Sequence, residues 1–117
     1  MSDALNSVIE TREFIQAAKR AGVSDVERAL IVDHFAEVPE DGSPLGGGLF
    51  KARIARPGGG KSGGYRTIHF FRGVDMPVVM LTIYAKNRKD ALSDAQQASY
   101  MKLADLLAEE LGKRRRK

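Results

Sequence analysis

Apolar residues recur with a helical period in the first part of the chain. In the segment EFIQAAKRA (13–21) they fall on one face of a helix, and Gly22 directly after it is a natural C-terminal stop. Ser24 and Glu27 then form a capping box, in which the two side chains satisfy the first backbone amides of a helix. This pattern predicts two N-terminal helices, over 13–21 and from Ser24 to about Ala36, followed by a loop at EDGSPLGGG.

The period changes to two after this loop. LFKARIA (49–55) alternates apolar and basic positions, as a strand with one apolar face does. YRTIHFFR (65–72) is rich in β-branched and aromatic residues, and VVMLTIYA (78–85) has the continuous apolar character of a central strand buried on both faces. Because the connections are short, we expect an antiparallel meander of three strands, with Ser7–Thr11 as a candidate for a short first strand.

The last part of the chain returns to a helical pattern. Ser93 and Gln96 form a second capping box, and the apolar stripe beyond it is expected to cover the sheet. Gly112 is the predicted end of this helix. The elements together predict a single α+β domain over residues 1–112, with an antiparallel sheet of three to four strands, two N-terminal helices and a C-terminal helix packed on it. We expect residues 113–117 to form a basic, disordered tail.

Length and composition narrow the class of protein. A chain of 117 residues corresponds to one domain. The absence of cysteine excludes a disulfide framework and a thiolate nucleophile or metal site. The N-terminal residues show no basic start followed by an apolar run, and PVVMLTIYA is far shorter than the ~20 residues of a membrane helix. We therefore expect a cytoplasmic protein without a membrane partner.

The charges are distributed unevenly along the chain. Residues 1–45 hold four Lys/Arg against nine Asp/Glu, whereas residues 46–89 hold nine Lys/Arg against one Asp. A basic half of this kind attracts a polyanion or an acidic partner. A solvated surface is the alternative interpretation, but the cations fall mainly on predicted strands and one loop.

The segment ARPGGGKSGGYR (55–66) matches the loose pattern [AG]-x-x-x-x-G-K-[ST] of a phosphate-binding loop, from Ala55 to Ser62. Such a loop needs a helix directly after its Lys-Ser, whereas a strand is predicted at this point of the chain. The neighbouring strand ends in KNRK rather than in a carboxylate that organises magnesium. A plain turn is the simpler alternative, yet two residues suffice for a hairpin and this loop has eight. We therefore interpret it as a cationic arm between two cationic strands.

Two stretches of the chain, FKARIARPGGGKSGGYRTI and LTIYAKNRKDALS, resemble the RelE/HigB toxins of bacterial type II toxin–antitoxin systems (the RelE/ParE superfamily). The resemblance extends from about Gly46 to Leu107, and GKSGGYR and YAKN are its most specific parts. It implies a small fold of the microRNase type and ribosome-dependent endonucleolytic cleavage of mRNA, without metal or other cofactor. The partners that it implies are the ribosome, mRNA and a cognate antitoxin, expected to be a helix-turn-helix protein.

The resemblance also implies a set of site residues. Arg66 matches the strand arginine of the family, and its planar fork suits a transition-state phosphate. The candidate catalytic residues are Arg66, Lys51, Arg53, Lys61 and Lys86. The candidate RNA-binding residues are Arg56, Tyr84, Asn87, Arg88 and Lys89. Because a lysine surrounded by cations loses its proton more easily, the candidates for the general base are Lys51, Lys61 and Lys86.

The two histidines and two departures from the family pattern bear on this interpretation. His69 lies three residues from Arg66 on one strand, so the two side chains should point to opposite faces, and we expect His69 to be structural. His34 is expected at the boundary of the core. Asn87 stands where an arginine is expected in the family, and Arg88 where an acidic residue is common. A ParE-like gyrase-inhibiting toxin and a non-catalytic nucleic-acid-binding module of the same fold are the alternative functions.

Overall fold

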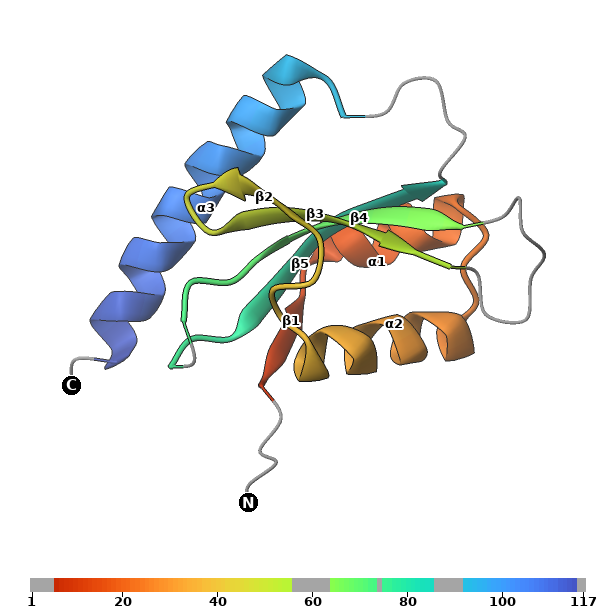
Figure 1. Cartoon of the computed structure of the whole chain (residues 1–117), viewed down its shortest axis with the longest axis horizontal. Coiled ribbons are helices and arrows are strands. Elements are labelled where there is room, and N and C mark those ends of the chain that lie inside the picture. Colours follow the sequence, from red (N-terminus) through yellow and green to blue (C-terminus); the bar gives the residue numbers. More distant parts are fainter. Residues whose placement is uncertain (1–5, 56–63, 74, 86–91, 116–117) are drawn as a thin grey trace.

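The computed structural model describes residues 6–55, 64–73, 75–85 and 92–115. In chain order its elements are β1 (Val8–Glu10), α1 (Arg12–Arg20), α2 (Asp25–Glu37), β2 (Ser43–Gly46), β3 (Leu49–Ile54), β4 (Tyr65–Phe70), β5 (Val78–Ala85) and α3 (Asp94–Arg115). The strands form one sheet in the order β1-β5-β4-β3-β2 (Figure 1). Among the residues described, none of the helices combines the length and apolar character that crossing a membrane requires.

The α+β class and the central meander are confirmed. Strands β3, β4 and β5 are antiparallel neighbours, and every residue of β5 from Val78 to Tyr84 is buried. The prediction of an antiparallel sheet of three to four strands is wrong in two respects. The sheet has five strands, and β1 pairs with β5 in parallel, with Val8 opposite Val78.

The extra strand, β2, lies inside the segment predicted to be a loop. It pairs with β3 in an antiparallel hairpin, and Gly46, Gly47 and Gly48 supply the positive φ angles of the bend between the two strands. Pro44 lies opposite Phe50, on an edge strand where proline is tolerated. Glycine and proline content therefore indicated the bend correctly but concealed the short strand before it.

Two separate cores cover the two faces of the sheet. Helices α1 and α2 pack on one face, where Phe14 and Phe35 are fully buried against residues such as Ala52 and Met80. Helix α3 packs on the other face through a cluster that includes Ala104. Figure 1 shows α2 below the strands, α1 behind them and α3 at the left of the sheet.

Thr11 joins β1 to α1 and fixes both to β5. Its backbone N–H and its hydroxyl both donate to the carbonyl of Met80, at 3.3 and 2.8 Å. The same hydroxyl accepts a hydrogen bond from the backbone N–H of Phe14 at 3.1 Å, which makes Thr11 the N-cap of α1. One side chain therefore ends the parallel pairing and starts the helix.

The predicted capping boxes are both present. The side chains of Ser24 and Glu27 exchange hydrogen bonds with each other's backbone amides, and so do those of Ser93 and Gln96. The predicted end of the last helix is wrong, because α3 continues through Gly112 to Arg115. Gly112 is not among the glycines with positive φ, so it adopts helical geometry and does not cap the helix.

Candidate nucleic-acid interface

The register of the sheet makes three predicted site residues cross-strand neighbours. Arg53 on β3 lies directly opposite Arg66 on β4, and Arg66 lies directly opposite Tyr84 on β5. Residues opposed in this way have Cβ atoms about 4.5–5.5 Å apart and project from the same face of the sheet. Lys51, two residues before Arg53, projects from that face as well. We call Lys51, Arg53 and Arg66 the cationic row.

The alternation of β3 explains why the cations face one way. Phe50, Ala52 and Ile54 turn toward α1 and α2, where they join or pack against the core, so the residues between them must point away. Helix α3 covers this second face mainly at its other end, through Leu49 and residues opposite it. Arg53 therefore stays exposed, and Lys51 and Arg66 are partly exposed.

Repulsion between the charges of the cationic row lowers the stability of the folded protein when no ligand is bound. Like charges that face each other across two strands destabilise a sheet. Within the described ranges, none of the ion pairs involves Lys51, Arg53 or Arg66. The arrangement is thus complementary to an anion that bridges β3 and β4, and an RNA phosphate has the right charge and the right acceptor oxygens.

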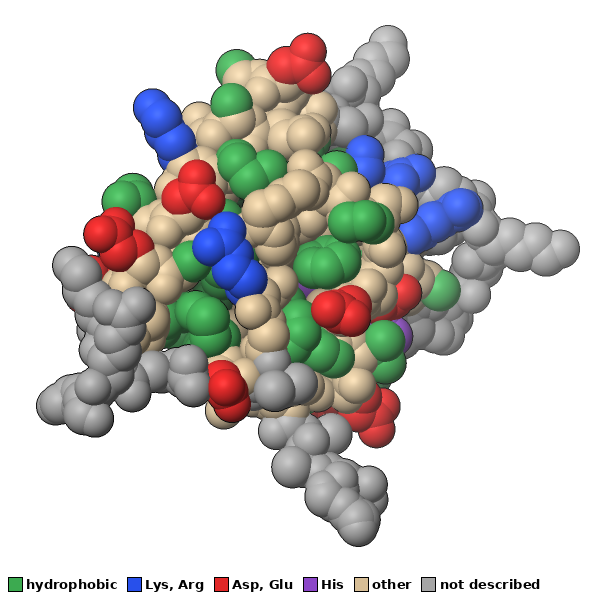
Figure 2. Space-filling view, turned by 60° about the vertical axis from the view of Figure 1, so that its left-hand side comes forward, with side chains coloured by type: hydrophobic (Ala, Val, Ile, Leu, Met, Phe, Trp, Pro, Cys, Tyr) green, Lys and Arg blue, Asp and Glu red, His purple; other side chains and the backbone are tan. Residues whose placement is uncertain are grey.

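The remaining predicted site residues lie outside the described residues. These are Arg56, Lys61, Lys86, Asn87, Arg88 and Lys89. The described strands β3 and β5 end at Ile54 and Ala85, which both lie opposite Tyr65, at the same end of the sheet as the cationic row. Figure 2 shows a group of Lys and Arg side chains at the upper right, whereas acidic and basic side chains are mixed over the rest of that face.

His69 belongs to the opposite face, as predicted from its spacing to Arg66. Its ring is fully buried and lies between Phe35 and Phe50, at centroid distances of 4.3 and 5.3 Å. Nε2 lies 2.8 Å from the carbonyl of Pro39, which assigns the proton to that nitrogen. Burial lowers the pKa of His69 to about 4. The histidine is a neutral core residue and takes no part in the cationic row.

His34 is half-buried at the end of α2, in agreement with a position at the core boundary. Its Nε2 lies 2.7 Å from the carboxylate of Asp41. The pair connects the end of α2 to the segment before β2. It therefore has a structural role.

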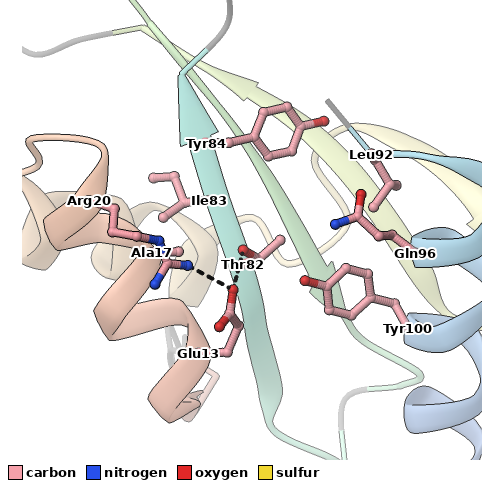
Figure 3. A pocket seen from close by; sticks show the side chains of 9 residues that line it. All are labelled: Glu13, Ala17, Arg20, Thr82, Ile83, Tyr84, Leu92, Gln96 and Tyr100. Atoms are coloured by element: carbon pink, nitrogen blue, oxygen red, sulfur yellow. Dashed lines mark hydrogen bonds and ion pairs between the residues drawn. The ribbon is translucent and has the colours of Figure 1, made fainter. Parts of the chain in front are cut away.

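A pocket of about 120 Å³ is lined in part by Tyr84, the cross-strand neighbour of Arg66. It lies between α1, β5 and α3, and Glu13, Tyr84, Gln96 and Tyr100 are among its lining residues (Figure 3). No sequence pattern singles out Glu13, Gln96 or Tyr100 as site residues. Gln96 and Tyr100 are one turn apart on α3, but only the tertiary fold brings them to α1 and to the end of β5.

The fold and the cationic row define a class: a small α+β protein that presents paired arginines on one face of its sheet. The comparison with protein families gives the particular group. The chain matches the family described as the RelE toxin of the RelE / RelB toxin-antitoxin system over residues 6–114. It therefore belongs to the RelE toxin family, and the family implies an antitoxin as its partner.

Proposed function

We propose that this protein is a toxin that stops translation by cutting mRNA on the ribosome, as a metal-independent endoribonuclease. The observation that carries the proposal is the cross-strand pair Arg53–Arg66, two arginines directly opposite each other without an ion-pair partner among the described residues. Membership in the RelE toxin family supports the same interpretation, because mRNA cleavage is typical of that family. A protein acting on cytoplasmic ribosomes is itself cytoplasmic.

The proposed reaction needs only groups of the RNA and of the cationic row. The 2′-oxygen attacks the adjacent phosphorus, the bond from phosphorus to the 5′-oxygen breaks, and the products are a 2′,3′-cyclic phosphate and a 5′-hydroxyl. The proton of the 2′-hydroxyl leaves to a base, and the departing 5′-oxygen takes up a proton. Negative charge builds up on the nonbridging oxygens, where Arg66 and Arg53 donate charge-assisted hydrogen bonds.

The proton transfers require a group that reaches the scissile bond from the same face. Lys51 is the lysine that the described part of β3 places there, on the face of Arg53 and Arg66. We assign it the role of exchanging protons with the RNA oxygens. Tyr84, opposite Arg66, is almost completely buried, so only the rim of its ring is available beside the bound strand.

The test is a cell-free translation reaction programmed with one defined message. Addition of the wild-type protein should arrest synthesis and produce cut message, which primer extension detects, and the cut ends should be a 2′,3′-cyclic phosphate and a 5′-hydroxyl. Arg66→Ala should lower the cleavage rate at least about 100-fold, because such donors contribute about 10²–10³ in rate. Arg66→Lys should restore only part of it, since the ammonium cannot donate in the bidentate manner.

Other outcomes identify the alternatives. Intact message together with inhibition of DNA supercoiling by gyrase would assign the protein to the ParE-like mode and refute the proposal. Co-purification with the product of a neighbouring helix-turn-helix gene would identify the antitoxin that we propose as partner. If Arg66→Ala, verified as folded by circular dichroism, cuts message at the wild-type rate, the assignment of the cationic row is wrong.

A further inference from the structure

The pocket at the end of β5 has a built polar lining that the proposed chemistry does not use. Strand β1 pairs only with Val78–Met80, so beyond Met80 no described strand covers the outer edge of β5. Helices α1 and α3 flank this open edge from opposite faces of the sheet, and the pocket of about 120 Å³ lies between them. Its volume is below the ~300–1,000 Å³ of sites for drug-sized ligands, so it accommodates a single ring system.

The charges in this pocket neutralise each other. The carboxylate of Glu13 lies 3.3 Å from the guanidinium of Arg20, and its Oε2 also accepts a hydrogen bond from the hydroxyl of Thr82 at 3.3 Å. Figure 3 shows both interactions at the α1 side of the pocket. The balance of charge favours a neutral polar ligand over an ion.

Two further groups, on the exposed side chains of Gln96 and Glu13, face the opening of the pocket. Oε1 of Gln96 accepts a hydrogen bond from the backbone N–H of Ser93 at 3.0 Å, so the amide NH₂ of Gln96 points elsewhere. Within the described residues neither that NH₂ nor Oε1 of Glu13 has a hydrogen-bond partner. The pocket thus offers one donor and one acceptor, one from each flanking helix.

Aromatic side chains complete the lining. Figure 3 shows Gln96 between the rings of Tyr84 and Tyr100. The Tyr84 ring is almost completely buried, and the Tyr100 ring is half-buried. Burial raises the pKa of Tyr100, and a hydrogen bond with the Thr82 side chain opposes that effect, so the Tyr100 hydroxyl is held at Thr82 on the pocket wall. A planar ring with donors and acceptors on its edge is the ligand that such a lining complements.

We propose that this pocket binds one unstacked nucleobase of the RNA strand and reads its hydrogen-bonding edge through Glu13, Gln96 and Tyr100. The inference rests on the proposed function, because Tyr84 belongs to the pocket and lies directly opposite Arg66. A strand whose phosphate lies over Arg66 places a neighbouring base at this opening. Single-stranded RNA is commonly recognised in this way, by splayed bases that stack on aromatic side chains and pair through their edges.

The test compares variants that exchange donor and acceptor without changing shape. Gln96→Glu keeps the capping box, since glutamate also fits that position, but replaces the free donor by an acceptor. Glu13→Gln makes the reverse change. Gln97→Glu is the matched control, because it makes the same change at the next position of α3, and Gln97 does not line this pocket.

The first measurement is sequencing of the cut ends in a pool of translated messages. In Gln96→Glu and Glu13→Gln the base preference at one fixed position beside the cut should change by about tenfold, which is typical of one base contact. Tyr100→Phe should weaken the preference at the same position, and Gln97→Glu should keep the wild-type profile. A wild-type profile in all three pocket variants, with full cleavage, overturns the pocket and leaves the proposed function intact.

The second measurement does not depend on cleavage. A 2′-O-methyl RNA hexamer, which cannot be cut, is added to ¹⁵N-labelled protein, and the side-chain amide signal of Gln96 is assigned through Gln96→Glu. A shift of this signal, with that of Gln97 unchanged, supports the pocket even if the wild-type protein cuts no message and the proposed function fails. If the signal shifts only with the antitoxin and not with RNA, the pocket binds protein and the inference is refuted.

Discussion

Arg53 and Arg66 are direct cross-strand neighbours at the end of the sheet where the chain leaves β3 and enters β4. Two cations in this position cost stability, and the described structure gives them no carboxylate in return. A pair that destabilises the free protein is understandable if it is stabilised by a bound phosphate. The Arg53–Arg66 pair should thus have opposite effects on folding stability and on RNA binding, and each effect can be measured.

Removal of one arginine should therefore stabilise the protein while it weakens RNA binding. Arg53→Ala is expected to raise the free energy of unfolding by a few tenths up to about 1 kcal/mol in low salt, and less at high salt, where the repulsion is screened. Urea denaturation at two salt concentrations measures this. RNA affinity should fall, and its salt dependence should become less steep by about one counterion. Arg72→Ala is the contrasting control, because Arg72 donates to Gly47 O at 2.7 Å and should destabilise when removed.

The hydroxyl of Thr11 should contribute more to stability than the hydroxyl of Thr67, although Thr67 is more deeply buried. Thr11→Val removes the N-cap of α1 and the hydrogen bond to Met80, so we expect a loss of about 1–2 kcal/mol. Thr67 is completely buried, and in the described part of the chain its hydroxyl has no hydrogen-bond partner. Thr67→Val should consequently be neutral or stabilising. Equal losses in both variants, measured by urea denaturation, would contradict this explanation.

The local patterns of the sequence were enough for most of the fold but not for its edges. Period-two alternation located β3 with its core-facing Phe50 and Ala52, and the apolar run located β5, because each pattern follows from burial. Strand β2 was missed since its residues are those of a turn, and its pairing depends on the hairpin with β3. The parallel pairing of β1 depends on a contact about seventy residues away, such as that of Val8 with Val78, which no local pattern encodes.

Some features of the candidate site likewise follow from local sequence patterns, whereas others depend on the tertiary fold. Spacing along a strand predicted that Lys51 and Arg53 share a face and that His69 faces away from Arg66, because side chains alternate along any strand. That Arg53 and Arg66 are direct neighbours depends on the register between β3 and β4, which local periodicity leaves open. The pocket at Glu13 and Gln96 combines three elements that are far apart in sequence, and no motif marks it.

The buried His69 should make the protein less stable in mild acid. Its pKa is lowered by burial from 6.5 to about 4, so the unfolded chain binds a proton more readily than the folded one. The associated stability is present above pH 6.5 and is lost as the pH falls toward 4, by about 1.4 kcal/mol at pH 5.5. His69→Gln keeps a donor for the Pro39 carbonyl but does not titrate in this range. The difference in unfolding free energy between wild type and variant should shrink between pH 7.5 and 5, and a constant difference would refute the assignment.

Gly42 should be much less tolerant of substitution than Gly22, although both have positive φ angles, of 113° and 81°. A Cβ at Gly42 would collide with the backbone carbonyl oxygen of Lys51 and come within 2.9 Å of the Cα of Ala52, whereas a Cβ at Gly22 meets nothing within 4 Å. Gly22→Ala should thus cost about 1 kcal/mol from backbone strain alone. Gly42→Ala should cost clearly more, and because it displaces β3 at Lys51 it should also lower RNA cleavage. Thermal denaturation of the two variants, followed by the cleavage assay at a temperature where both are folded, tests both effects. If Gly42→Ala is no less stable than Gly22→Ala and cuts message normally, the packing of this turn against β3 does not position the cationic row.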